Sequence, residues 1–180
     1  MLILIGYRAT GKTTLARLLG ERLQMRAVDT DPLIEQKAGR TIADIFAELG
    51  EPAFRDYESQ VIAELLCDKP LVIATGGGLP VRPANRVLLR NAGKIVWLKA
   101  SPETILRRMT GDPATERMRP QLTTMPPLDE ITSLLRAREE IYREIADLEI
   151  DTDDVSLSEL ADRVAVWYIE VQRAKMKNES

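Results

Sequence analysis

The segment that most constrains the fold of this chain is a glycine-containing loop near the amino terminus. Residues 6–13 read GYRATGKT, which matches the phosphate-binding pattern of Gly, four residues and Gly-Lys-Ser/Thr. An apolar run at 1–5 precedes this phosphate loop, and leucines follow it at helical spacing at Leu15, Leu18, Leu19 and Leu23. A turn that merely joins a strand to a helix is the simpler alternative, but the motif requires this order of strand, loop and helix. The sequence therefore predicts a nucleoside triphosphate site within an α/β fold.

The residue types in the phosphate loop have a direct chemical reason. Glycines let the backbone approach a phosphate closely, and the start of the following helix adds the positive end of its dipole. Lys12 has the length to reach the β- and γ-phosphates, and the Thr13 hydroxyl is a ligand for Mg²⁺. We expect nucleotide contacts from this segment at Gly6, Ala9, Thr10, Gly11, Lys12, Thr13 and Thr14.

Composition excludes several other classes of protein. The net charge of −3 and an aromatic content of 4% argue against a nucleic acid or a membrane surface as the main partner. Without histidine, schemes that use a histidine base or metal ligand are ruled out. The single Cys67 cannot form an internal disulfide, and the first strand begins at Met1 with no signal peptide before it. We expect a cytoplasmic protein.

Apolar runs alternate with helical patterns along the whole chain. After the first strand we expect strands at 26–30, 71–74, 94–98 and 148–151. Helices are expected at 31–38, 42–49, 51–66, 83–91, 102–110, 128–146 and 157–172. This alternation predicts a three-layer α/β/α fold with a mainly parallel sheet of about five strands. Residues 111–127 form a long loop typical of a lid, and a frayed tail is expected at 174–180.

Three polar segments each follow an expected strand. They are the phosphate loop, the acidic turn at 29–31 and the glycine loop at 75–78. Ligands of such sheets bind at the carboxyl ends of the strands, so we expect these segments to meet. In the acidic turn, one carboxylate can hold Mg²⁺ and the other can accept a proton from an attacking hydroxyl. Asp31 also sits at an expected helix N-cap, and whether capping is its only role stays open.

The glycine loop and two arginines suggest an acceptor site. Three consecutive glycines, Gly76, Gly77 and Gly78, leave backbone N–H groups bare and favour a loop that faces a substrate. Arg138 lies inside the apolar stripe of its helix and needs an anionic partner, although an arginine at the edge of that stripe can also reach solvent. Arg55 is a second candidate, but a salt bridge to Glu58 would explain it equally well.

Missing motifs exclude other nucleotide-binding classes. Neither Asn-Lys-x-Asp nor Asp-x-x-Gly, which GTPases carry, occurs in the sequence. The strand at 71–74 ends in Thr-Gly, whereas the ATPases of motors end the corresponding strand in Asp-Glu. A small kinase with a lid remains.

Several motifs in order make the chain resemble shikimate kinase. They are the phosphate loop, Asp-Thr-Asp at 29–31, GRTIADIF at 39–46, Phe54-Arg55 followed by Glu58, the triple glycine and Arg119-Pro120. The resemblance covers about residues 2–172 and implies a nucleoside-monophosphate-kinase-like fold with strand order 2-3-1-4-5. It implies one domain over 1–180, with substrate-binding helices at about 31–66 and a lid at about 111–127.

The activity implied by the resemblance is transfer of the ATP γ-phosphate to the 3-hydroxyl of shikimate, on the route to chorismate and the aromatic amino acids. Mg²⁺ is the implied cofactor, ATP and shikimate are the implied partners, and the enzyme is expected to be a monomer. A related small-molecule kinase, such as one that acts on gluconate, is the alternative. A catalytically silent ATP-binding module is a third possibility, which the set of Lys12, Asp31 and Arg119 argues against.

The resemblance also assigns roles to individual residues. Lys12, Asp31 and Arg119 match catalytic positions, with Asp31 as the base on the shikimate hydroxyl. Further matches are Arg55 and Arg138 for the shikimate carboxylate, the glycine loop for the substrate, Arg108 and Arg119 for the nucleotide, and Thr13 and Asp29 for Mg²⁺. Ala9 departs from the family, many of whose members have glycine there, and the role of Arg117 stays open.

Overall fold

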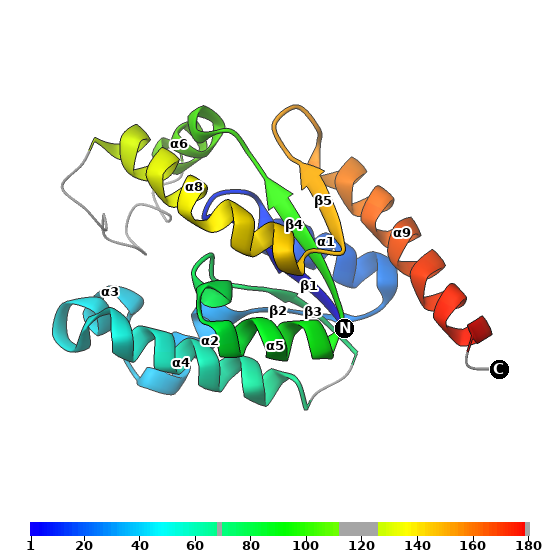
Figure 1. Ribbon diagram of the computed structural model, residues 1–180, viewed down its shortest axis with the longest axis horizontal. Helices are drawn as coiled ribbons and strands as arrows, with labels where there is room; N and C mark the ends of the chain where they lie inside the picture. Colours follow the sequence, from blue (N-terminus) through cyan, green and yellow to red (C-terminus); the bar gives the residue numbers. More distant parts are fainter. Residues whose placement is uncertain (68–69, 112–125, 179–180) are drawn as a thin grey trace.

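The sheet has five strands, all parallel, in the spatial order β2-β3-β1-β4-β5. The structure is a computed structural model that describes residues 1–67, 70–111 and 126–178 (Figure 1). The strands are β1 (Leu2–Ile5), β2 (Arg26–Asp29), β3 (Leu71–Ala74), β4 (Lys94–Lys99) and β5 (Leu148–Asp151). Both the number of strands and their predicted order are confirmed.

Helices connect the strands and cover both faces of the sheet (Figure 1). Their bounds are α1 (Lys12–Leu23), α2 (Thr30–Ala38), α3 (Ile42–Asp44), α4 (Gly50–Leu65), α5 (Pro83–Ala92), α6 (Pro102–Thr110), α8 (Pro127–Ile145) and α9 (Leu157–Asn178). Two short turns of other helix types are the π-helix η1 (Ile45–Leu49) and the 3₁₀-helix η2 (Leu79–Val81).

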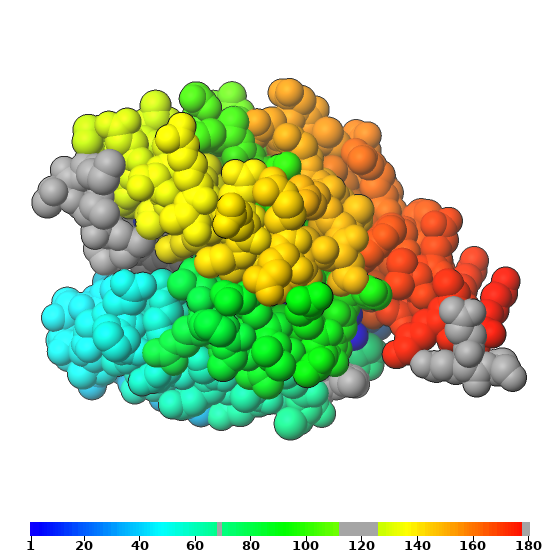
Figure 2. Space-filling model, in the orientation of Figure 1, coloured from blue at the N-terminus to red at the C-terminus, as the bar shows by residue number. Residues whose placement is uncertain are grey.

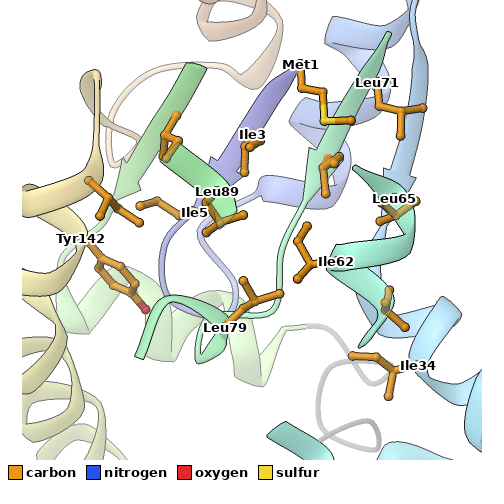
Figure 3. Close-up of a cluster of buried hydrophobic side chains, with 14 of the residues drawn as sticks. Met1, Ile3, Ile5, Ile34, Ile62, Leu65, Leu71, Leu79, Leu89 and Tyr142 are labelled. Carbon is orange, nitrogen blue, oxygen red and sulfur yellow. The ribbon is translucent and has the colours of Figure 1, made fainter. Parts of the chain in front are cut away.

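Alternation along the central strand divides the core into two layers. Leu2 and Leu4 of β1 pack with residues of α1 and α9, whereas Ile3 and Ile5 pack with residues of α4, α5 and α8. Successive side chains of a strand point to opposite faces, so one apolar strand supplies both layers. Figure 3 shows the second layer, where Ile3, Ile5 and Tyr142 lie close to one another. The predicted three-layer α/β/α arrangement is confirmed.

Two predicted element boundaries are wrong. Thr30 was expected to end a strand, but it begins α2, because the Asp29 side chain caps the helix two residues earlier than expected. The last helix was expected to end at Gln172, but α9 continues to Asn178, so residues 174–178 of the expected tail are helical. The strong helix formers Ala174 and Lys175 account for this extension.

On the face seen in Figure 2, α5 (green) lies beside α8 (yellow). An ion pair of 3.6 Å between Arg86 Nε and Glu144 Oε2 links the two helices there. In the part of the chain that the structure describes, every helix is too short or too polar to cross a membrane.

Candidate active site

Three loops meet at the carboxyl edge of the sheet, as the sequence predicts. Strands β2, β3 and β1 are neighbours, so the acidic turn, the glycine loop and the phosphate loop start side by side. The Thr13 hydroxyl of the phosphate loop donates to Asp29 Oδ2 at 2.5 Å. The N–H of Gly76 donates to the Thr30 hydroxyl at 3.0 Å. Hydrogen bonds therefore connect the acidic turn to both other loops.

The backbone of the phosphate loop depends on left-handed residues. Gly6 has φ of 140°, and a side chain there would clash with the carbonyl oxygen of Leu98. Gly11, with φ of 92°, is the N-cap residue of α1, so the N–H groups of the first turn of α1 face the loop. Ala9 has φ of 60°, a left-handed conformation that glycine adopts more easily than alanine. The chain keeps the left-handed turn with alanine, at a cost in strain.

Lys12 is folded onto the phosphate loop itself. Its Nζ donates to the Tyr7 carbonyl oxygen at 2.5 Å and lies 3.5 Å from the Thr10 hydroxyl. The Thr10 hydroxyl donates to the same Tyr7 carbonyl at 2.8 Å. The lysine is 8% exposed, so its ammonium group is held at the loop, where incoming phosphates would bind. Thr14 is exposed on the first turn of α1.

Both oxygens of Asp29 have partners. Oδ2 accepts from Thr13, and Oδ1 accepts from the N–H of Asp31 at 3.0 Å. Asp29 is therefore the N-cap of α2, and the prediction that Asp31 occupies that position is wrong. Asp31 lies in the first turn of α2, where the helix dipole favours an ionised carboxylate. Capping does not account for Asp31.

The Thr13 and Asp29 pair fits a magnesium ion bound together with a nucleotide. Mg²⁺ prefers oxygen ligands and takes one or two of them from the protein, with water and phosphate oxygens completing the shell. A hydroxyl and a carboxylate already 2.5 Å apart at the phosphate loop match that donor set. Among the described residues, no group of three His, Cys, Asp or Glu side chains forms a separate metal site.

Each glycine of the glycine loop makes a different contact in the structure. The N–H of Gly76 is bonded to Thr30, so the expectation of bare N–H groups is wrong at this position. The Gly77 carbonyl accepts from the Tyr142 hydroxyl at 2.6 Å. A Cβ at Gly78 would lie 2.5 Å from Cζ of Arg55, so the arginine packs directly on the loop.

Arg55 carries two ion pairs within its own helix, α4. Its Nη1 lies 2.7 Å from Glu58 and its Nη2 lies 2.6 Å from Glu51. Burial lowers the pKa of Arg55, but the two carboxylates outweigh that effect and raise it. Arg55 therefore forms the salt bridge to Glu58 that was the alternative explanation for it. It also packs against Gly78, which places it beside the glycine loop.

Arg138 has a different environment. Its Cζ lies 5.7 Å from the centroid of the Tyr7 ring, and it neighbours Tyr142. Within the described residues, no carboxylate forms an ion pair with Arg138, whereas Arg136 on the same helix is exposed. The geometry leaves the Arg138 guanidinium available to an anion.

Four further residues lie at these loops, and the sequence patterns did not single them out as site residues: Tyr7, Arg8, Glu130 and Tyr142. Arg8 of the phosphate loop forms an ion pair of 3.0 Å with Glu130 of α8, which is 1% exposed. Burial raises the pKa of Tyr7, so the phenol stays neutral. Two features of the sequence could have indicated these residues. One is a charged residue within the phosphate loop, and the other is Tyr142 in the apolar stripe of α8.

On the other side of the phosphate loop, Arg108 binds the loop that follows β5. Its guanidinium donates to the Thr152 carbonyl at 2.5 Å and to the Thr152 hydroxyl at 3.0 Å. It also lies 3.4 Å from the Ala9 carbonyl oxygen. Arg117, Arg119 and most of the expected lid lie outside the described residues.

Comparison with known proteins agrees with this geometry. The family model described as shikimate kinase matches residues 8–168. The chain belongs to the shikimate kinase family. A shikimate kinase of Rhodopirellula baltica is 44% identical over 163 residues, which cover 91% of this chain and 87% of the relative.

Solved structures place the fold in the same family. Shikimate kinase from Acinetobacter baumannii in complex with shikimate superposes with a TM-score of 0.87 at 36% identity, covering 94% of this chain and 92% of the other. A gluconokinase from Sinorhizobium meliloti has a TM-score of 0.62 at 16% identity, covering 99% and 96%. The gluconokinase shares the fold alone, and the shikimate kinase family accounts for both fold and sequence.

Proposed function

We propose that this kinase transfers the γ-phosphoryl group of ATP to the 3-hydroxyl of shikimate, giving shikimate 3-phosphate and ADP. The observation that carries the proposal is the set of three loops at one sheet edge, with an arginine beside them that has no carboxylate partner among the described residues. This arrangement suits an acceptor that has both a hydroxyl and a carboxylate. The product would serve chorismate and aromatic amino acid biosynthesis.

The nucleotide half of the site uses the phosphate loop. Lys12 would exchange the Tyr7 carbonyl for the β- and γ-phosphates, because a phosphate is the stronger partner for an ammonium group. Thr13 and Asp29 would hold Mg²⁺, which neutralises charge on the phosphates when bound. Arg108 would lie against the adenine, on the side where it joins Thr152 to Ala9.

The acceptor half combines Asp31 with the two arginines. Asp31 would orient the attacking hydroxyl and accept its proton. Arg138 would bind the shikimate carboxylate in a charge-assisted contact. Arg55 would contribute from its place beside Gly78, and the glycine loop would let the substrate ring approach the backbone.

Charge in a loose transition state for phosphoryl transfer is spread over the oxygens of the transferred group. Lys12 and Arg119 would stabilise that charge, with Arg119 contributed by the lid. Closure of the lid at about 111–127 would exclude water and limit hydrolysis of ATP. We also propose that the enzyme is a cytoplasmic monomer.

A coupled assay of ADP release tests the proposal. The purified protein is incubated with Mg²⁺ and ATP, and with shikimate, gluconate or no acceptor. We expect ADP release with shikimate alone, and ³¹P NMR should place the phosphate on the 3-hydroxyl. Turnover with gluconate but not with shikimate would favour the alternative, and no turnover at all would indicate a silent module.

A further inference from the structure

Tyr7 occupies a central position between the two halves of the site. Its ring is 2% exposed and packs with Ile105 of α6 and Ile131 of α8. Its backbone carbonyl accepts from Lys12 at 2.5 Å. Because a buried ring among fixed apolar side chains has no room to turn, the face that it presents to its neighbours is constant.

Two guanidinium groups lie over the Tyr7 ring. Cζ of Arg8 is 5.6 Å from the ring centroid and Cζ of Arg138 is 5.7 Å from it, both within the range of a cation–π interaction. Arg8 is neutralised by Glu130 at 3.0 Å. Arg138 has no such carboxylate in the described part of the chain, so the Tyr7 ring and the Tyr142 hydroxyl are the groups that hold its guanidinium at this edge of the sheet.

We propose that Tyr7 is a positioning residue for Arg138, and that its aromatic face holds the guanidinium ready for the carboxylate of the acceptor. An arginine that is already ordered loses less side-chain freedom when it binds an anion, so ordering before binding increases affinity. The Arg8–Glu130 pair has a complementary effect, because it keeps a second guanidinium from competing for the same carboxylate. A residue of the phosphate loop thus contributes to the selectivity for an acceptor that has a carboxylate.

This inference rests on the proposed function, because it names the residue behind one of its contacts. The test compares the wild type with Tyr7→Phe, which keeps the ring, and Tyr7→Leu, which removes it. The KM values for shikimate, for its neutral methyl ester and for ATP are measured for each protein. Tyr168→Leu is the matched control, because Tyr168 is a buried tyrosine that packs with residues of α1 and α9 instead.

Loss of the ring should raise the KM for shikimate roughly tenfold, the size expected for one cation–π contact with partial desolvation. The KM for the ester and the KM for ATP should change by less than about twofold, since neither uses this contact. Tyr7→Phe should restore the wild-type KM for shikimate, because phenylalanine presents the same face. Tyr168→Leu should lower thermal stability without a selective change in any KM.

A second series covers the case in which Tyr7→Leu does not fold. Phenylalanines with increasing numbers of ring fluorines at position 7 keep the shape of the ring and weaken its negative face. The KM for shikimate should rise with each fluorine. In an enzyme that uses shikimate, two results would overturn the positioning role of Tyr7. One is an equal change in the KM for shikimate and the KM for its ester in Tyr7→Leu, and the other is a KM for shikimate that does not change with fluorination. Failure of the wild type to use shikimate would instead overturn the proposed function together with this inference.

Discussion

Arg8, Arg55 and Arg138 lie around the same loops and have different electrostatic environments. Arg8 is paired with the buried Glu130, and Arg55 is paired with Glu51 and Glu58. For Arg138 the structure describes aromatic neighbours only. Since a half-buried guanidinium without an acid is less favourable than one that is paired, the third arginine is the one that gains most from an anionic ligand.

Arg138→Ala should therefore affect the acceptor selectively. The KM for shikimate is expected to rise roughly 10- to 100-fold, the range for loss of a hydrogen-bonded charge contact. The KM for ATP should barely change. Steady-state kinetics with each substrate varied in turn measures both values, and Arg136→Ala on the exposed side of α8 is the control. An unchanged KM for shikimate would remove Arg138 from the acceptor site.

Ala9 adopts a left-handed conformation that a glycine adopts without strain. Ala9→Gly is expected to increase the free energy of unfolding by about 0.5–1 kcal/mol, because relief of strain outweighs the added entropy of the unfolded chain. Urea titration measures this difference. Ala63→Gly, at an exposed position within α4, should instead lose about 1 kcal/mol. Equal destabilisation by the two substitutions would contradict the assignment of strain to Ala9.

At the residue scale, the sequence was enough to predict that several of the site residues lie close together. Lys12 and Thr13 follow β1 and Asp29 ends β2, so the topology of a parallel sheet is enough to bring them together. Glu130 and Tyr142 come from a distant helix, and their contacts with the phosphate and glycine loops depend on how that helix packs. A sequence pattern marks them only as an acid near a helix start and an aromatic in a stripe.

At the scale of elements, short connections between helices and strands stabilise the nucleotide side of the sheet. Asp153, in the loop between β5 and α9, accepts two hydrogen bonds of 3.1 Å from the N–H of Ser101. Burial raises the pKa of Asp153, but the hydrogen bonds from Ser101 outweigh it, and the pKa lies below its ordinary value. Ser101 in turn caps α6, the helix that carries Arg108.

A folded-state pKa below the unfolded value gives stability that is present above about pH 4 and is lost as the pH falls through the folded pKa. Asp153→Asn should therefore lower the free energy of unfolding by about 1 kcal/mol at pH 7. The difference should shrink as the pH falls below about 4 and the Asp153 carboxylate begins to be protonated. Urea midpoints from pH 3 to pH 7 measure the trend, with the exposed neighbour Asp154→Asn as control. A difference that is independent of pH would exclude the carboxylate charge as its cause.

The existence of the strands and major helices could be predicted, whereas some of their ends could not. Apolar runs indicate strands, and Thr41 with Asp44 forms the capping box expected from the sequence. The π-helical turn at Ile45–Leu49 replaces the second half of one predicted helix, which no propensity scale distinguishes from an α-helix. Asp29 and Asp31 are both favourable N-cap residues, so the sequence pattern does not decide at which of them α2 begins.

At the scale of the whole molecule, α8 contacts two of the three loops that form the site. Through Glu130 and Arg138 it reaches the phosphate loop, and through Tyr142 it reaches the glycine loop. The helix also packs in the core beside Ile5, as Figure 3 shows for Tyr142. Strand order, by contrast, was expected from the family resemblance, because apolar runs do not specify which strands are neighbours.

Ligand binding should stabilise the entire fold by mass action. Shikimate at about 100 times its Kd should add about 2.7 kcal/mol to the free energy of unfolding, and a non-hydrolysable ATP analogue with Mg²⁺ should add a similar amount. Thermal denaturation should show each as a rise in Tm of roughly 5–10 °C. In Arg138→Ala a 10- to 100-fold weaker affinity should reduce the stabilisation by shikimate at the same concentration to roughly 0.4–1.4 kcal/mol, while the nucleotide shift remains. An undiminished shift with shikimate would show that the carboxylate is bound elsewhere.

The packing of Arg55 on Gly78 constrains how the sequence can change during evolution. A side chain at position 78 would push the guanidinium away from the buried Glu58, and a shorter residue at position 55 would remove the ion pair between Arg55 and that acid. Either substitution alone should therefore destabilise the fold. Because Arg55 is also proposed to contact the acceptor, positions 55, 58 and 78 are expected to be retained together across descendants of this gene.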